Sequence, residues 1–191
     1  MKWLERGSRG LWLFSLTGPL ALQTLILLAM GLPAICTCGH VELWHGNPSG
    51  PETSQHVADW YTFTHVLHGI GFYFLLWLIA PRMPFAWRFA LAIGLEAAWE
   101  VLENTPLIVE RYRQGALARG YSGDSIVNSV SDTLATALGV VMARFLPTRP
   151  VIALVIASEL FLGYTIRDNL TLNIVQLVYP SEAISQWQTG R

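Results

Sequence analysis

Residues 11–35 read LWLFSLTGPLALQTLILLAMGLPAI, a predominantly apolar stretch without a charged side chain. An α-helix needs about 20 such residues to cross the hydrocarbon core of a bilayer. The stretch therefore predicts a membrane-spanning helix. It is too long for the apolar part of a signal peptide, and no cleavage site of small residues follows it, so we expect an uncleaved first span.

The composition of the whole chain agrees with this interpretation. Of its 191 residues, 52% are hydrophobic and only 13% are charged, well below the roughly 25% charged residues of a soluble domain. Further apolar runs at residues 60–80, 87–104, 125–145 and 151–168 predict four more spans. We therefore expect an all-α fold, in which residues 1–191 form a single polytopic bundle of about five transmembrane helices.

The segments between the predicted spans differ in length. Short turns with prolines at 81–84 and 147–150 would join neighbouring spans in antiparallel pairs. The longer segments, 36–59, 105–124 and 169–191, would all lie on the opposite, outer side. Within them, residues 107–117 and 170–179 predict helices that lie along the membrane interface.

The distribution of basic residues predicts the orientation of the chain. Lys2, Arg6 and Arg9 precede the first span, whereas residues 36–59 contain no Lys or Arg. By the positive-inside rule we expect the N-terminus in the cytoplasm and the C-terminus on the outer side, which in a bacterium with two membranes is the periplasm. Because the net charge is −1, nucleic acid is not an expected partner; membrane lipids are, and a protein partner or a homo-oligomer stays open.

The predicted spans carry ionisable side chains at helical spacing, mainly toward the outer side of the membrane. A charged side chain facing lipid is costly, so these stripes are expected to converge on a polar cavity open to the outer side. The candidate catalytic residues of that cavity are His65, His68, Glu100, Glu103, Asn128, Asp132 and Arg167. Glu96 and Glu159 fall in the inner halves of their predicted spans, which are otherwise mostly apolar, and they are left out of this set.

Imidazoles and carboxylates together suit a divalent metal such as Zn, Mn or Fe. The candidate metal ligands are His65, His68, Glu100, Glu103 and Asp132. The sequence lacks the His-Glu-x-x-His motif of zinc proteases and the two Glu-x-x-His motifs of ferritin-like di-iron bundles, so a metal-free acid–base pair is an open alternative. The same polar residues could also hold the helices together by hydrogen bonds, but two His and at least four carboxyls exceed what that role requires.

Two cysteines follow the first span, in the string Cys36-Thr37-Cys38-Gly39-His40. With His45 and His56 nearby, this pair could bind a soft metal. A disulfide between residues two apart is sterically awkward. The role of the two cysteines is left open at this point.

Several longer strings carry a family resemblance. They include CTCG at 36–39, DWY at 59–61, HVLHG at 65–69, WEVLEN at 99–104, GDSIVNSVSDT at 123–133 and IRDNLTLN at 166–173. The chain closely resembles a family of uncharacterised bacterial inner-membrane proteins found mainly in alphaproteobacteria. The resemblance implies a multi-span protein of the bacterial inner membrane, with the N-terminus cytoplasmic and the C-terminus periplasmic in the predicted orientation, and it implies no particular activity. The predicted fourth span is also similar to a helix of VanZ-like membrane proteins, at Asp124, Asn128, Asp132 and Gly139.

Three functions are compatible with these observations. The first is a membrane-embedded hydrolase or transferase, with or without a metal, that acts on a lipid or lipid-linked substrate. In it Asn128 would orient the substrate and Arg167 would meet its negative charge. The second is a non-enzymatic accessory or assembly subunit, and the third is a small carrier for an ion or solute. Because the predicted cavity opens on only one side of the membrane, a continuous pore is disfavoured.

Overall fold

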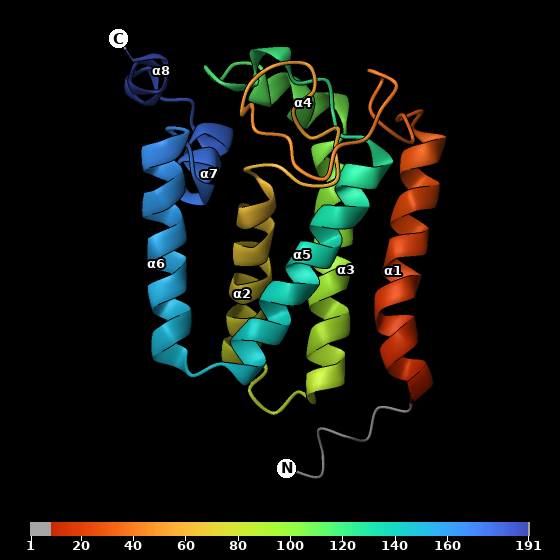
Figure 1. Cartoon of the computed structure of the whole chain (residues 1–191). Coiled ribbons are helices and arrows are strands. Elements are labelled where there is room, and N and C mark those ends of the chain that lie inside the picture. The colour runs from red at the N-terminus through yellow and green to blue at the C-terminus, as the bar shows by residue number, and fades with distance from the viewer. Residues whose placement is uncertain (1–8, 191) are drawn as a thin grey trace.

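The computed structural model describes residues 9–190, and within them it is helical without strands, as predicted (Figure 1). Its long helices lie side by side: α1 (Arg9–Ala29), α2 (Thr62–Ile79), α3 (Phe85–Glu103), α5 (Ile126–Phe145) and α6 (Thr148–Thr165). Short helices gather at one end with the loop of residues 30–61: α4 (Pro106–Tyr112), η1 (Ala118–Gly120), α7 (Leu170–Val178) and α8 (Glu182–Thr189). Lys2 and Arg6, on which the predicted orientation partly rests, lie outside the described residues.

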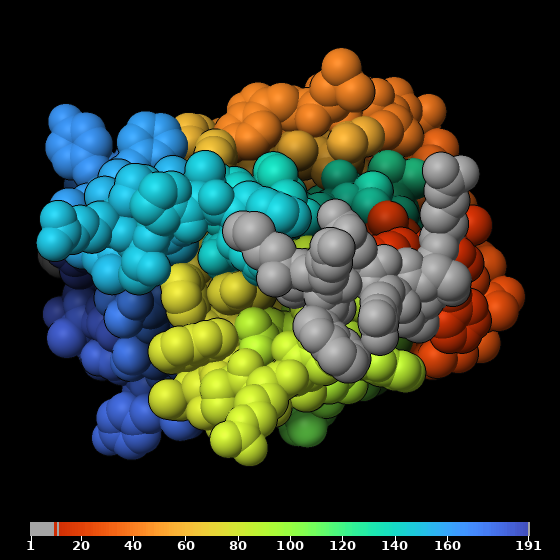
Figure 2. All heavy atoms as spheres, turned by 90° about the horizontal axis from the view of Figure 1, so that it is seen from below, coloured from red at the N-terminus to blue at the C-terminus, as the bar shows by residue number. Residues whose placement is uncertain are grey.

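Four of the long helices, α1, α2, α5 and α6, are long and apolar enough to cross a membrane. Seen from the end opposite the loops, α1 and α6 lie on opposite sides of the bundle (Figure 2). Apolar side chains such as Phe14 and Leu25 on α1 and Leu160 on α6 are more than half exposed, as expected of surfaces that face lipid. α3 has 19 residues but carries Arg88 and three glutamates, so it is the polar helix of the bundle.

The backbones of α2 and α5 pack directly against one another. Gly69 and Gly139 face one another there, and a Cβ on Gly69 would overlap the carbonyl oxygen of Thr136. Small residues at such a crossing let two helix backbones pack directly. Thr136 Oγ1 also donates a hydrogen bond of 2.8 Å to the carbonyl oxygen of His65. This crossing fixes the upper half of α2 against α5.

Polar side chains also tie α1 to α5. Gln23 Nε2 donates to Ser129 Oγ at 2.7 Å, and Gln23 Oε1 accepts from Thr133 Oγ1 at 2.8 Å. All three residues are buried. This network fits the role of hydrogen-bonded glue between helices.

Three helix boundaries differ from the predicted ones. α1 ends at Ala29 rather than 35, because Gly31 takes a left-handed φ of +85° and Pro33 follows. α6 covers 148–165 rather than 151–168, since Arg167 has a φ of +55° just after its end. The interfacial helix predicted at 107–117 is shorter and covers Pro106–Tyr112, while the apolar segment predicted at 170–179 is α7.

The orientation of the bundle can be tested by labelling single cysteines. In a chain with Cys36 and Cys38 replaced by Ser, cysteines at Arg82 and Glu110 would occupy exposed positions, in the α2–α3 turn and on α4. A membrane-impermeant maleimide should label Glu110→Cys on whole cells. It should label Arg82→Cys only after the inner membrane is permeabilised. The reverse pattern would invert the predicted topology.

Candidate functional site

A cavity of about 600 Å³ lies between α2, α3, α4 and α7 and the loops at their end of the bundle. One part of its wall is polar and is lined by His65, His68, Glu103, Asp124, Asp132 and Asp168, with Tyr61, Tyr112 and Tyr121. The remaining wall is largely apolar and includes Phe72, Leu95, Trp99, Leu102, Leu170, Ile174 and Leu177. The cavity therefore joins an ionisable end to an apolar slot.

Glu96 bridges the two histidines of α2. Its Oε1 lies 2.5 Å from Nδ1 of His65, and its Oε2 lies 3.1 Å from Nδ1 of His68. The carboxylate side chain is completely buried, whereas 17% of the His68 side chain is exposed. A carboxylate accepts hydrogen bonds, so both imidazoles donate through Nδ1; Nε2 is then an acceptor in the neutral ring and a second donor in the protonated ring.

Two further carboxylates approach His65. Asp132 Oδ2 lies 3.7 Å from Nε2 of His65, and its Oδ1 accepts a hydrogen bond of 2.9 Å from Thr62. Glu100 Oε1 lies 3.3 Å from Nδ1 of His65, and its Oε2 accepts a hydrogen bond of 2.6 Å from Ser129. The His65 side chain is thus approached by three carboxylates that are almost fully buried.

This group is rich in negative charge for its depth. Even with His65 and His68 both protonated, two positive charges would face the carboxylates of Glu96, Glu100 and Asp132. Several ionised carboxylates without enough cationic partners are strongly disfavoured away from water. The cluster must therefore take up protons or a cation. His65, Glu100 and Glu103 each offer an atom within 4.8 Å of the others, as do His65, His68 and Glu96.

The structure brings together most of the candidate residues named from the sequence. His65, His68, Glu100, Glu103 and Asp132 all belong to this cluster. Asn128 is buried on α5, one helical turn before Asp132. Neither of its amide atoms has a hydrogen-bond partner among the described residues.

Arg167 lies elsewhere. Its side chain is exposed, and Nη1 donates to the carbonyl oxygen of Trp187 at 3.1 Å. It is not one of the residues that line the cavity. Arg111 does line it, but its guanidinium donates to the carbonyls of Leu177 and Val178 at the end of α7. Glu159 accepts from the amides of Leu170 and Thr171 and so caps the start of α7.

Glu96 is the residue of the cluster that sequence reasoning left out. It precedes the last residue of α3 by seven positions, or about 10 Å at a rise of 1.5 Å per residue. His68 lies six positions inside the start of the antiparallel helix α2, or about 9 Å deep. The two residues are therefore level, and counting from both helix ends could have identified Glu96.

Asp124 has a structural role at the rim of the cavity. Its Oδ2 accepts a hydrogen bond of 2.6 Å from Asn104, and its Oδ1 accepts one of 2.8 Å from Tyr121. Burial raises the pKa of the Asp124 carboxyl to about 6, against the effect of these two hydrogen bonds. The pair of Asn104 and Asp124 ties the end of α3 to the start of α5.

Comparison with known proteins places the chain in a family. The model of a family described as "Protein of unknown function (DUF2585)" matches residues 27–190. The chain belongs to this family. All residues of the cavity cluster lie inside the matched range, and the expected membership of an uncharacterised family is confirmed.

Close relatives of the family carry the name UPF0314 protein. The one from Paracoccus denitrificans is 50% identical over 171 residues, covering 90% of this chain and 89% of the relative. The one from Sphingopyxis alaskensis is 50% identical over 183 residues, covering 96% and 97%. The one from Agrobacterium fabrum, Atu8092, is 48% identical over 179 residues, covering 94% and 90%. Comparison with solved structures finds no match. The similarity to VanZ-like proteins stays a prediction.

Asp168 supplies a pH-dependent group at the cavity wall, just beyond the end of α6. Its Oδ2 accepts a hydrogen bond of 3.3 Å from the hydroxyl of Tyr61, and its Oδ1 accepts one of 3.0 Å from the amide of Asn169. Burial raises the pKa of the Asp168 carboxyl to about 6, although the Asn169 amide acts in the opposite direction. The folded protein therefore holds this proton more tightly than the unfolded chain does.

We predict that Asp168 destabilises the protein as the pH rises from 5 to 7.5. The contribution of Asp168 to the free energy of unfolding is fully present below the unfolded pKa of about 3.9 and is lost as the pH rises through the folded pKa of about 6. Between pH 5 and pH 7.5 the free energy of unfolding should fall by roughly 1–2 kcal/mol for this reason. Asp168→Asn stays neutral throughout. The melting temperature of the variant in detergent, followed by tryptophan fluorescence, should rise relative to wild type between pH 5 and pH 7.5. A difference in melting temperature between variant and wild type that is the same at pH 5 and pH 7.5 would contradict the prediction.

Proposed function

We propose that this membrane protein is an enzyme that acts on an amphiphilic substrate, a lipid or a lipid-linked molecule, by hydrolysis or group transfer. The observation that carries the proposal is the setting of His65. One ring nitrogen lies 2.5 Å from Glu96, the other lies 3.7 Å from Asp132, and the ring lines the cavity. An imidazole held between two carboxylates beside an accessible space is suited to proton transfer.

The cavity wall supports an amphiphilic substrate. Trp99, Leu102, Ile174 and Leu177 offer an apolar surface for an acyl or isoprenoid chain. The polar head would then meet the histidines at the other end of the same space. A volume of about 600 Å³ falls within the range of small-molecule sites, roughly 300–1,000 Å³.

In this proposal Glu96 holds the two imidazoles in position, and the imidazoles carry out the proton transfer. Glu96 accepts from Nδ1 of His65 and His68, which fixes both rings and both tautomers. Nε2 of His68 can then remove a proton from a water molecule or from a substrate hydroxyl. Asp132, beside Nε2 of His65, stabilises the positive charge that His65 acquires when it takes a proton.

The same side chains suit a divalent metal ion, because imidazole nitrogen and carboxylate oxygen are ligands of Zn, Mn and Fe. Two sets have ligand atoms within 4.8 Å of one another and could hold one: His65, Glu100 and Glu103, or His65, His68 and Glu96. Such an ion would neutralise the excess negative charge of the cluster and would polarise a carbonyl or phosphoryl oxygen. Elemental analysis of the purified protein distinguishes this version from a metal-free acid–base site.

We further propose that the bundle sits in a bacterial inner membrane with α4 and α7 on the periplasmic side. The cavity would then be reached from the outer leaflet. Arg82, in the α2–α3 turn, and Arg149, in the first turn of α6, lie at the opposite end and would face the cytoplasm, as the positive-inside rule expects.

The proposal predicts that replacing a carboxylate or an imidazole of the cluster with the amide of glutamine abolishes function. Glu96→Gln cannot accept hydrogen bonds from both imidazoles, and His68→Gln replaces the imidazole with an amide that cannot remove a proton. In a strain that lacks the gene, each variant at wild-type membrane abundance should fail to restore the lipid profile measured by mass spectrometry. Glu110→Gln, the same change at an exposed position on α4, should restore it fully.

The opposite result would favour the structural role. Intramembrane hydrogen bonds average only about 0.6 kcal/mol, so glutamine should replace glutamate in a cluster that merely joins helices. Full complementation by both Glu96→Gln and His68→Gln would therefore contradict the enzyme proposal. It would leave an accessory or assembly subunit as the better account.

A further inference from the structure

The charge of the cavity wall restricts the headgroup that the proposed amphiphile can carry. Four carboxylates line the cavity, each from a different place in the fold: Glu103 ends α3, Asp124 lies just before α5, Asp132 lies within α5 and Asp168 follows α6. The three aspartates are no more than 5% exposed. Burial raises the pKa of Asp124 and of Asp168 to about 6, so both carboxyls are mostly ionised at neutral pH.

The described part of the wall offers few cationic groups to match these carboxylates. Arg111 is the single arginine among the described residues that line the cavity, and its guanidinium donates to the carbonyl oxygens of Leu177 and Val178. Within residues 9–190 every ion pair involves a histidine, and the two histidines at the wall are already outnumbered by carboxylates. An anionic headgroup would add to the uncompensated charge, whereas a cationic headgroup would offset it.

Aromatic rings stand beside the same carboxylates. The hydroxyl of Tyr121 donates to Asp124 at 2.8 Å, and the hydroxyl of Tyr61 donates to Asp168 at 3.3 Å. Tyr112 packs edge-on against Tyr121 with ring centroids 5.8 Å apart, and all three tyrosines line the cavity. The faces of aromatic rings attract cations, and proteins use them to bind alkylated ammonium groups.

A buried hydroxyl at this wall has no partner of its own. Thr53 lines the cavity and is 7% exposed, and its Oγ1 has no hydrogen-bond partner among the described residues. The loop that carries Thr53 is anchored on the start of α5: Pro33 accepts from the amide of Ile126 at 2.9 Å, and Ser54 accepts from the amide of Ser125 at 3.0 Å. Because a buried hydroxyl without a partner is unfavourable, a polar ligand group that reaches it is stabilised.

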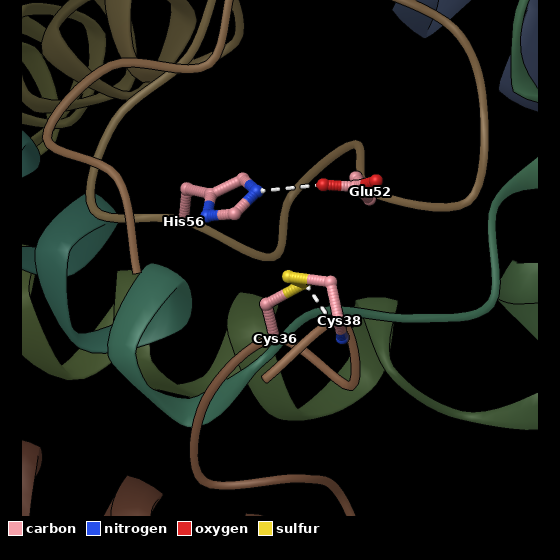
Figure 3. Close-up of side chains that lie close together, drawn as sticks. All are labelled: Cys36, Cys38, Glu52 and His56. Atoms are coloured by element: carbon pink, nitrogen blue, oxygen red, sulfur yellow. Dashed lines mark hydrogen bonds and ion pairs between the residues drawn. A yellow bond between two sulfur atoms is a disulfide. The ribbon is translucent and has the colours of Figure 1, made fainter. Parts of the chain in front are cut away.

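The same loop is closed on itself by the side chains in Figure 3. Cys36 and Cys38 form a disulfide with their Cα atoms 5.2 Å apart, so the turn between them permits the pairing that residue spacing alone made awkward. The amide of Glu42 donates to Nδ1 of His56, which leaves Nε2 to donate to Glu52 at 3.3 Å. In this arrangement neither the sulfurs nor Nε2 is free to bind a metal. These side chains instead fix the shape of a loop that lines part of the cavity.

We propose that the cavity binds an amphiphile with an ammonium headgroup, such as a lipid that ends in an ethanolamine or a choline group. The ammonium group lies among the four carboxylates and the tyrosine rings and supplies the positive charge that this wall lacks. The hydrocarbon chain lies along the apolar wall of Trp99, Leu102 and Ile174. This inference rests on the proposed function, because it names the class of the amphiphilic substrate.

Native mass spectrometry of the full-length protein in a neutral maltoside detergent tests this class of ligand. Phosphatidylcholine and phosphatidylethanolamine are each compared with phosphatidylglycerol, which carries the same acyl chains and phosphate but no ammonium group. At least one of the two ammonium lipids should bind about tenfold better than phosphatidylglycerol. Equal binding of all three lipids, or a preference for phosphatidylglycerol, would overturn the proposal.

Variants of the wall test where the ammonium group binds. Glu103→Gln and Asp168→Asn each remove one negative charge from the cavity and should each reduce the preference by at least about threefold. Glu110→Gln removes the same charge at an exposed position on α4 and should leave the preference unchanged. A preference that persists undiminished in both cavity variants would overturn the proposed site.

Choline chloride separates a lipid from a free ammonium ion as the ligand. It has no chain to cover the apolar wall, so it should displace the lipid only weakly; choline that binds as tightly as the lipid would overturn the amphiphile. Binding is measured without turnover and therefore fails separately from the enzyme proposal. Full complementation by Glu96→Gln and His68→Gln would contradict the enzyme and leave the lipid preference intact, whereas equal lipid binding would overturn the ammonium headgroup alone.

Discussion

The glycine contact between α2 and α5 is the constraint on which the site depends. Gly69 and Gly139 let the two backbones meet, and a Cβ at either position would overlap a carbonyl oxygen of the other helix. His65 lies about one turn above this contact, where its carbonyl oxygen accepts from Thr136. The imidazole is therefore held against α5, within 3.7 Å of Asp132. A larger residue at the crossing would push the two helices apart and would thereby separate His65 from Asp132.

Two kinds of polar interaction then coexist in the bundle. The network of Gln23, Ser129 and Thr133 uses neutral groups, and both ends of the glutamine amide are hydrogen-bonded. The cluster around His65 uses charged groups in excess of its cationic partners and lines a cavity. Neutral groups are sufficient to join helices, so the cost of burying carboxylates has to be offset by another role. The two groups meet at Ser129, whose hydroxyl accepts from Gln23 and donates to Glu100, so the site differs from the rest of the polar core in its charge and in lining the cavity.

Hydropathy and helical spacing predict most of this arrangement. Apolar runs predict the helices because a bilayer requires about 20 apolar residues, and stripes of charge predict which faces turn inward. Other features depend on tertiary contacts that spacing does not contain. The bridging role of Glu96 arises from the antiparallel register of α2 and α3, and the cysteine pair depends on a turn held against α5. Arg167 is displaced from the cavity because its backbone turns left-handed just beyond α6.

The central claim is that the cavity holds an amphiphile beside the histidines. Identifying the lipids that stay bound to the purified protein tests this claim most directly. Wild-type protein extracted with its surrounding membrane should retain a defined lipid class, identified by mass spectrometry. Ile174→Trp, which fills the apolar wall, should lose it, while Leu160→Trp on the outer face of α6 should keep it. A lipid profile that is the same in all three proteins and matches the bulk membrane would contradict the account.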